Sequence, residues 1–260
     1  MQDILIVGNF VKDVYLRLDT RRNNFEKDQD GINWLDLSFD SSTHNFFSRI
    51  AFLTGSAITQ EVFENFGIKS DFLSSNTKEH PVYRYILCNE DQVTYFSPNK
   101  FPDNTWQEPS YIPKWIYIDR SAHLNLDFAH KLIDYLSRNP ATKVATFVSR
   151  HSNLNAEYMK LILDHSTIII SDTEGDVQPH ILIANHGIHC QGHSAYWQKN
   201  GKDDLDTHLS AHQTAAATMF SALFNGKKSD EAVKLAAANV ENSTLSTTLT
   251  PDELAENLSK

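Results

Sequence analysis

The amino-terminal part of the chain begins with a run of apolar residues and continues with segments in which apolar and polar residues alternate. Residues 4–7 are Ile-Leu-Ile-Val, an unbroken run that is typical of a strand buried on both faces. Residues 14–19 and 32–39 alternate apolar and polar side chains, which predicts strands with one exposed face. Residues 20–30 are polar without periodicity and predict a loop. We therefore expect one inner strand followed by strands of a second, more exposed sheet.

The next stretch predicts helices and then a hairpin. Residues 46–53 follow a polar cluster that suits a helix N-terminus, and we expect a helix there. Residues 58–66 predict a second helix, which ends at Gly67. Residues 81–87 and 92–96 alternate and are joined by Asn-Glu-Asp, which predicts two antiparallel strands.

From Trp115 onward, short apolar runs alternate with amphipathic ones. This pattern is typical of parallel strands connected by helices. The expected strands are residues 115–119, 143–148, 167–170, 181–184 and 194–197, and the expected helices are residues 127–136 and 155–163.

The carboxyl-terminal part predicts two helices rich in small residues. Residues 210–213, Ser-Ala-His-Gln, are expected to form a short polar turn before a helix over 214–224. Gly226 follows as a stop signal. Ser-Asp-Glu at 229–231 is capping chemistry for a second helix over 232–240.

Taken in order, these elements resemble the PfkB (ribokinase-like) family of carbohydrate and nucleoside kinases. In that family the first strand ends in Gly with an Asp five residues on, as Gly8 and Asp13 do here. A Gly-Ala-Gly-Asp turn precedes a buried helix that ends in Gly, and it aligns with residues 210–213 and Gly226. The resemblance implies an α/β fold, a three-layer αβα sandwich with a mostly parallel sheet and a small β lid. Residues 1–260 would form a single ribokinase-like domain, with lid strands at approximately 14–39 and 81–97.

The resemblance also implies a set of site residues. Gln213 occupies the position of the family's catalytic base, with His212 beside it. The other implied positions are Asn9, Asp13 and Asn45 for substrate, Ser210, Ala211 and His212 for an anion hole, and Glu174 and Gly187 for nucleotide and magnesium.

Three of the four residues at 210–213 differ from the Gly-Ala-Gly-Asp turn of the family. A glutamine amide can hold a hydroxyl group but cannot accept a proton near neutral pH. His212 stands where the family has a glycine, so a ring occupies the place of bare backbone. The sequence leaves two main functions open. One is ATP- and magnesium-dependent phosphoryl transfer to a sugar or nucleoside hydroxyl, which is weakened or lost because of Gln213 unless His212 serves as a displaced base. The other is a non-catalytic homologue, a pseudokinase that binds a ligand or partner; a different reaction on the same scaffold is a third option.

Composition and charge exclude some classes of binding partner. The formal net charge of −10 argues against nucleic acid, whose phosphates would be repelled. No apolar run reaches the roughly 20 residues that span a bilayer, so no membrane partner is expected. Two cysteines without a CxxC pattern suggest a cytoplasmic protein. The histidines show no zinc-type spacing, and we expect no metal held by His or Cys. A homodimer through the lid remains open.

Overall fold

The computed structural model describes residues 3–18, 46–88, 93–96, 101–149, 152–173, 177–184, 186–197 and 207–242. The strands are β1 (Ile4–Val7), β2 (Phe10–Leu18), β3 (Phe46–Gly55), β4 (Ser70–Leu73), β5 (Val82–Cys88), β6 (Val93–Phe96), β7 (Trp115–Ile118), β8 (Lys143–Val148), β9 (Ile168–Ser171), β10 (Ile181–Ala184), β11 (Gly187–Cys190) and β12 (His193–Tyr196). The helices are α1 (Ser56–Asn65), α2 (Leu126–Arg138), α3 (Glu157–Asp164), α4 (Thr207–Phe224) and α5 (Ser229–Asn242).

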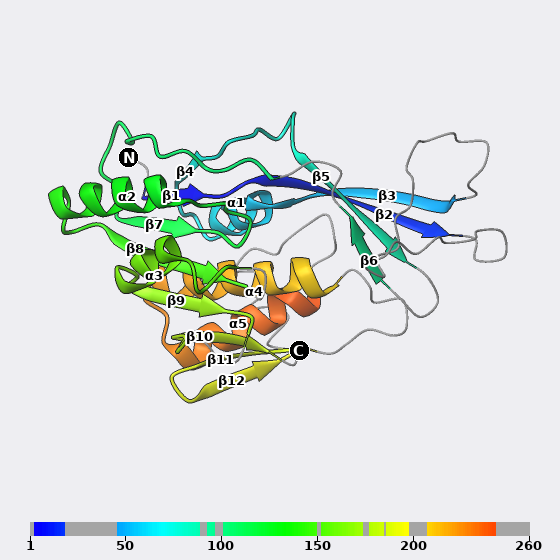
Figure 1. Ribbon diagram of the computed structural model, residues 1–260. Coiled ribbons are helices and arrows are strands. Elements are labelled where there is room, and N and C mark those ends of the chain that lie inside the picture. Colours follow the sequence, from blue (N-terminus) through cyan, green and yellow to red (C-terminus); the bar gives the residue numbers. More distant parts are fainter. Residues whose placement is uncertain are drawn as a thin grey trace.

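The main sheet has eight strands in the order β12-β11-β10-β9-β8-β7-β1-β4 (Figure 1). Pairing is parallel from β4 through β10, and β11 and β12 add an antiparallel edge. The predicted parallel sheet is thus confirmed. All the parallel strands present their carboxyl ends at the same side of the sheet, where open α/β sheets bind ligands.

Helices cover both faces of this sheet, which gives the expected three layers. Alternate residues of β1 point to opposite faces, as strand geometry requires. Ile4 and Ile6 join a core with side chains of α1, α4 and α5, whereas Leu5 and Val7 join a second core with α2 and α3. Burial on both faces explains why β1 is an unbroken apolar run.

The second sheet has four strands in the order β3-β2-β5-β6. It extends from the main sheet as a long ribbon of β2 and β3, beside β5 and β6 (Figure 1). The strands expected at residues 81–87 and 92–96 are present as β5 and β6, which pair antiparallel. The strand predicted at residues 32–39 lies outside the described residues.

The helix predicted at residues 46–53 is wrong, because this segment is strand β3. β3 pairs antiparallel with β2 from Phe10↔Gly55 to Leu18↔Phe46. That partner satisfies the backbone groups on one side of β3, and Phe, Ile and Thr suit strands better than helices. Pairing with a distant strand therefore outweighs the local preference for a helix that the capping sequence indicates.

The turn predicted at residues 210–213 is also wrong, because α4 begins earlier, at Thr207. In an α-helix only about the first four amides lack an intrahelical acceptor. The amides of Ala211 and His212 therefore lie in the body of the helix. The rest of this region is as predicted: Gly226 follows α4 with φ of 80°, and α5 comes next.

Gly187, which the resemblance implies for nucleotide and magnesium, begins strand β11. It pairs with Ala184 of β10 and Tyr196 of β12. A Cβ atom added to Gly187 would lie 2.5 Å from Cδ1 of Tyr196. Packing of the Tyr196 ring over bare backbone thus accounts for this glycine without a ligand.

Within the described residues, no helix combines the length and the apolar character that crossing a bilayer demands.

The close approach of Gly187 and Tyr196 can be tested by a double-mutant cycle. We expect Gly187→Ala to lower the free energy of unfolding by about 1–3 kcal/mol, as overpacking does, measured by urea denaturation. The loss should largely disappear in a Tyr196→Ala background, where the ring is absent. An equal loss in both backgrounds would contradict this explanation.

Candidate active site

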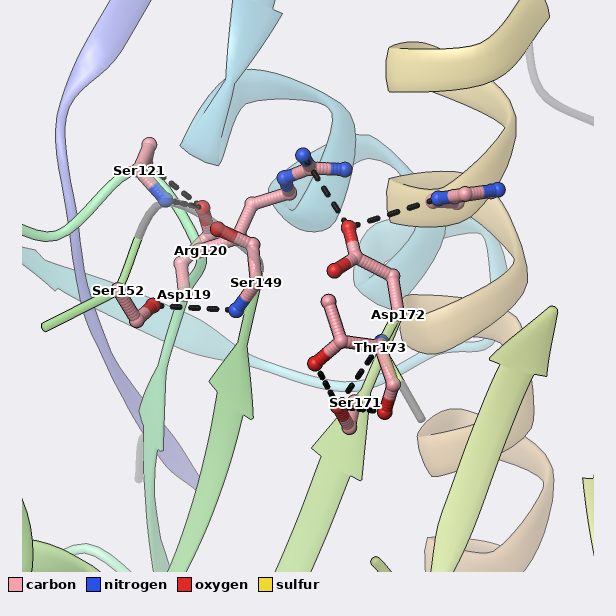
Figure 2. Close-up of polar contacts among 9 residues, drawn as sticks. Asp119, Arg120, Ser121, Ser149, Ser152, Ser171, Asp172 and Thr173 are labelled. Atoms are coloured by element: carbon pink, nitrogen blue, oxygen red, sulfur yellow. Dashed lines mark hydrogen bonds and ion pairs between the residues drawn. The ribbon is translucent and has the colours of Figure 1, made fainter. Parts of the chain in front are cut away.

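Polar side chains gather where the parallel strands of the main sheet end. Asp119 directly follows β7, Ser149 follows β8 and Asp172 follows β9. Figure 2 shows these three residues beyond the tips of neighbouring strands, with Arg120 reaching toward Asp172. Because parallel strands end at one edge, residues that are far apart in sequence meet here.

Asp119 is the most enclosed of these groups, with an exposed fraction of 1%. Its Oδ1 accepts hydrogen bonds from the backbone N–H of Ser121 at 2.8 Å and from Ser121 Oγ at 2.6 Å. Its Oδ2 accepts from Thr59 Oγ1 at 2.5 Å and from Gln213 Nε2 at 2.6 Å. A buried carboxylate is stable only with such partners, and these come from three different elements.

Gln213, the residue at the expected base position, belongs to this network. It is 4% exposed, and its Nε2 also donates to Thr59 Oγ1 at 3.2 Å. The network ties α4, which carries Gln213, to α1, which carries Thr59, and to the end of β7. Gln213 thus serves the packing of three elements at once.

The glycine that ends the first strand is explained by the same network. A Cβ atom on Gly8 would lie 2.2 Å from Ser56 Oγ, 2.8 Å from Ser121 Oγ and 3.0 Å from Asp119 Cβ. Ser56 Oγ and Ser121 Oγ are themselves 3.1 Å apart. Only a residue without a side chain leaves room for these groups to converge.

Asn9 joins the network through Ser121. Its backbone N–H donates to Ser121 Oγ at 3.0 Å, and its Nδ2 lies within 3.3 Å of three oxygens, those of Ser121 O, Pro102 O and Asn104 Oδ1. Asn9 is fully buried, and its Oδ1 has no protein partner. Asn9 therefore braces the loops at this edge while retaining one unused acceptor.

Tyr117 adds a second enclosed polar atom near Asp119. Its hydroxyl has no partner, and burial, together with the Asp119 carboxylate, raises its pKa well above the ordinary value. The phenol consequently stays neutral, and it cannot act as a base at physiological pH.

Asp172 forms a second cluster, with Arg120 and His212. Arg120 Nη2 lies 3.3 Å from Asp172 Oδ2, and His212 Nδ1 lies 3.5 Å from the same oxygen. The Asp172 side chain is 5% exposed and that of His212 is 18% exposed. The Arg120 guanidinium also lies over the Phe147 ring, 5.5 Å from its centroid. His212 therefore has a carboxylate beside one ring nitrogen, an arrangement that can orient an imidazole.

Asp13, a predicted substrate residue, is engaged within the second sheet. Arg84 donates from Nε to Oδ1 and from Nη2 to Oδ2, both at 2.6 Å, and Thr54 Oγ1 donates to Oδ2 at 3.0 Å. Asp13 and Arg84 are direct neighbours in the β2–β5 register. The fully buried carboxylate therefore already has a bidentate protein partner.

The structure thus gathers only some of the predicted site residues. Asn9 and Gln213 meet through Ser121 and Asp119, and His212 lies beside Asp172. Gly187 belongs to the β10–β11–β12 edge, and Ser210, Ala211 and His212 lie in helix α4 instead of an anion-hole turn. Asn45 and Glu174 are outside the described residues.

Sequence reasoning missed three residues at the ends of the parallel strands, Asp119, Arg120 and Asp172, and also Arg84, the partner of Asp13 in the second sheet. The sequence contained a signal for two of them, because Asp119 directly follows strand β7 and Asp172 directly follows strand β9. A carboxylate at that point of a parallel strand lies at the ligand-binding edge.

Potential metal ligands do not cluster among the described residues. No group of three or more His, Cys, Asp or Glu side chains among them could hold a metal ion. Asp172, the carboxylate beside His212, already contacts Arg120. ATP and magnesium therefore remain cofactors implied by the family resemblance.

The buried pair of Asp13 and Arg84 makes a stability prediction. Arg84→Met should leave the Asp13 carboxylate buried without its main partner and cost about 3 kcal/mol, the lower end for buried pairs because the Arg84 side chain is 23% exposed. Urea denaturation measures the loss, and Asp13→Leu in addition should recover most of it.

The exposed bidentate pair of Arg138 and Glu108 supplies a matched control. Arg138→Met removes the same kind of contact at the surface and should change stability little. Equal losses in the Arg84 and Arg138 variants would show that burial of Asp13 is not what makes its partner necessary.

Comparison with known proteins shows which of them share this fold. A scan of family models found no match, and neither did a search of curated proteins. Solved structures do match. A nucleoside kinase of Methanocaldococcus jannaschii, an archaeal member of the ribokinase family, aligns over 100% of this chain and 98% of its own, with a TM-score of 0.67 and 13% identity.

Two further kinases match over similar lengths. Ribokinase of Arabidopsis thaliana, complexed with ribose and ATP, aligns over 100% of both chains with a TM-score of 0.65 and 10% identity. Adenosine kinase of Schistosoma mansoni, in complex with 2-fluoroadenosine, aligns over 94% of this chain and 96% of its own, with a TM-score of 0.59 and 12% identity. The chain therefore has the fold of the ribokinase-family kinases.

Proposed function

We propose that this protein binds a small hydroxyl-bearing molecule, a sugar or a nucleoside, at the carboxyl ends of its parallel strands. We also propose that residue 213 no longer acts as a general base for phosphoryl transfer. The ligand class is suggested by the neighbours in fold, which were solved with ribose and with 2-fluoroadenosine. The location is supported by the rule that open parallel sheets bind ligands at this edge.

The observation that carries the proposal is the contact between Gln213 and Asp119. The Gln213 amide donates to a buried carboxylate at 2.6 Å, and it also contacts Thr59. An amide has no proton-accepting capacity in the useful pH range, and general-base help is typically worth about 10²–10⁴ in rate. A group that is both non-basic and held by its neighbours cannot act as the family's base.

Ligand screening and a transfer assay test the proposal together. We expect D-ribose or adenosine, at about 100 times its Kd, to stabilise the protein by about 2.7 kcal/mol in thermal unfolding. In the same mixture with magnesium-ATP, radiolabelled phosphate should not be transferred to the probe.

Arg138→Met serves as a control in that screen, because it removes an exposed ion pair away from the strand ends and should leave the stabilisation by the probe unchanged. Rapid transfer of phosphate by the wild-type protein would contradict the loss of catalysis. Absence of stabilisation by either probe would contradict the ligand class.

A second candidate function is slow kinase activity with His212 as the base. It is favoured by the Asp172 carboxylate beside His212 Nδ1, at 3.5 Å. A carboxylate near one ring nitrogen favours the tautomer with its proton on that side, which leaves the other nitrogen as an acceptor.

If transfer is detected, His212→Ala should reduce its rate by about 10²-fold or more, since a general base contributes that much. His212→Gln is the matched variant that keeps hydrogen bonding without basicity, and it should be equally inactive. Transfer that survives both substitutions would rule out His212 as the base.

A further inference from the structure

Strands β9–β12 form the half of the main sheet that is covered by helices on one face only. Alternate side chains of these strands, including Ile170, Ile183 and Ile188, pack in the core that contains α4 and α5. The second core lies on the opposite face, where α2 and α3 pack on β1, β4, β7 and β8, and it contains no side chain of β9–β12. Among the described residues, no helix therefore packs on that face of β9–β12.

The connection between β9 and β10 accounts for this gap in the helix layer. Residues 172–180 join these two parallel strands. A connection between parallel strands usually takes a dozen or more residues and forms a helix that covers the sheet. The described part of this connection, residues 172–173 and 177–180, contains no helix. The sheet face beside α3 is thus left without the cover that parallel strands normally have.

The uncovered face carries no charged side chain. β9–β12 contain no Asp, Glu, Lys or Arg, although the chain as a whole has a formal net charge of −10. Ile169, Leu182 and Tyr196 point away from the core with α4 and α5, because their neighbours along each strand point into it. Ile169 and Leu182 are half-buried, and Tyr196 is 63% exposed. An exposed apolar surface of this kind marks a contact site.

The dimensions of this face decide what it can hold. Each of the four strands has four residues, which span about 13 Å, and four strands occupy a width of about 19 Å. The flat area is thus about 250 Å², well below the roughly 800 Å² per partner of a stable complex between two proteins. One helix of about ten residues is about 15 Å long and about 10 Å wide, so a single short helix matches the face.

A segment with a suitable sequence follows α5. Residues 243–260 lie outside the described residues. Their sequence contains Thr-Pro-Asp-Glu at 250–253, which combines an N-cap, a proline at the first helical position and the glutamate of a capping box. Leu254, Ala255 and Leu258 follow at the spacing of one helix face. Residues 251–260 therefore predict a short amphipathic helix.

This segment also starts close to the uncovered face. α5 begins at the β11–β12 turn, where Ser229 Oγ donates to Gln191 Oε1 at 2.7 Å, and it lies alongside β11 and β12 (Figure 1). The chain therefore leaves α5 beside the outermost strands of the sheet. Residues 243–250 can span up to about 26 Å. Passing around β12 from one face to the other takes about 20 Å, which is two layer spacings.

We propose that residues 251–260 form a helix that docks on the uncovered face of β9–β12, with Leu254 and Leu258 against Ile169 and Leu182. The helix supplies the missing layer from within the chain, and its charged side chains face the solvent. A segment of the same chain is present at a high effective concentration, so a small contact area suffices. The inference is independent of the proposed function, because it involves no ligand at the strand ends.

A thiol-accessibility experiment on the full chain tests this docking. In the Leu182→Cys protein the introduced thiol lies beneath the proposed helix, and its reaction with N-ethylmaleimide is followed by mass spectrometry of that peptide. Leu254→Ser/Leu258→Ser should accelerate the labelling about tenfold or more, because only the undocked population reacts. Glu256→Ser/Lys260→Ser is the matched control, with the same spacing on the opposite side of the helix, and should leave the rate within about twofold of the parent.

The labelling rates decide between the occupants of this face. Labelling that is equally fast with and without the two leucines would overturn the proposal, as would an equal acceleration in the control. Labelling that slows when the protein concentration is raised about a hundredfold would also overturn it, since a second copy would then cover the face. If the Leu182→Cys protein does not fold, as judged by circular dichroism, Tyr196→Cys replaces it, because a side chain that is 63% exposed tolerates the change.

Discussion

The structure depends on one constraint, that a carboxylate taken out of water must find donors within the protein. Three aspartates meet this constraint, two at the ends of the parallel strands and one within the second sheet, and each meets it with groups from other elements. Asp119 binds residues of α1 and α4, and Asp172 contacts a residue after β7 and one of α4. Asp13 joins β2 to β3 and β5. The buried charges therefore hold α1 and α4 to the strand ends and hold the strands of the second sheet to one another.

This constraint explains why an amide occupies position 213. A carboxylate there would face Asp119 across a single hydrogen-bond distance, and two like charges in a buried setting repel strongly. A glutamine instead supplies a donor that Asp119 needs. Gln213 thus stabilises the packing of α4 on α1 and on the end of β7. Restoring an acid at 213 would require a change at Asp119 as well.

Much of the fold could be predicted because its signals are local. The apolar run at residues 4–7, the strand–helix alternation after Trp115 and the glycine after α4 each have one dominant interpretation. β3 could not be predicted in this way. Its residues follow a good capping sequence, and only pairing with β2, some forty residues away, makes it a strand. The predicted start of α4 was wrong for a related reason. Residues 210–213 were aligned with a glycine turn of the family, but here they are part of the helix.

The site was less predictable than the fold, because a motif fixes positions in the chain but not the contacts they make. Gln213 was recognised as a substitution for an acid, yet its partner Asp119 lies 94 residues away and belongs to no motif. Asp13 kept the family's spacing, yet Arg84 on the neighbouring strand occupies its carboxylate. In both cases the contacts of a side chain depend on a residue that lies far away in the sequence, and no local pattern indicates that residue. The residues that specify the fold are therefore easier to predict from sequence than the contacts within the site.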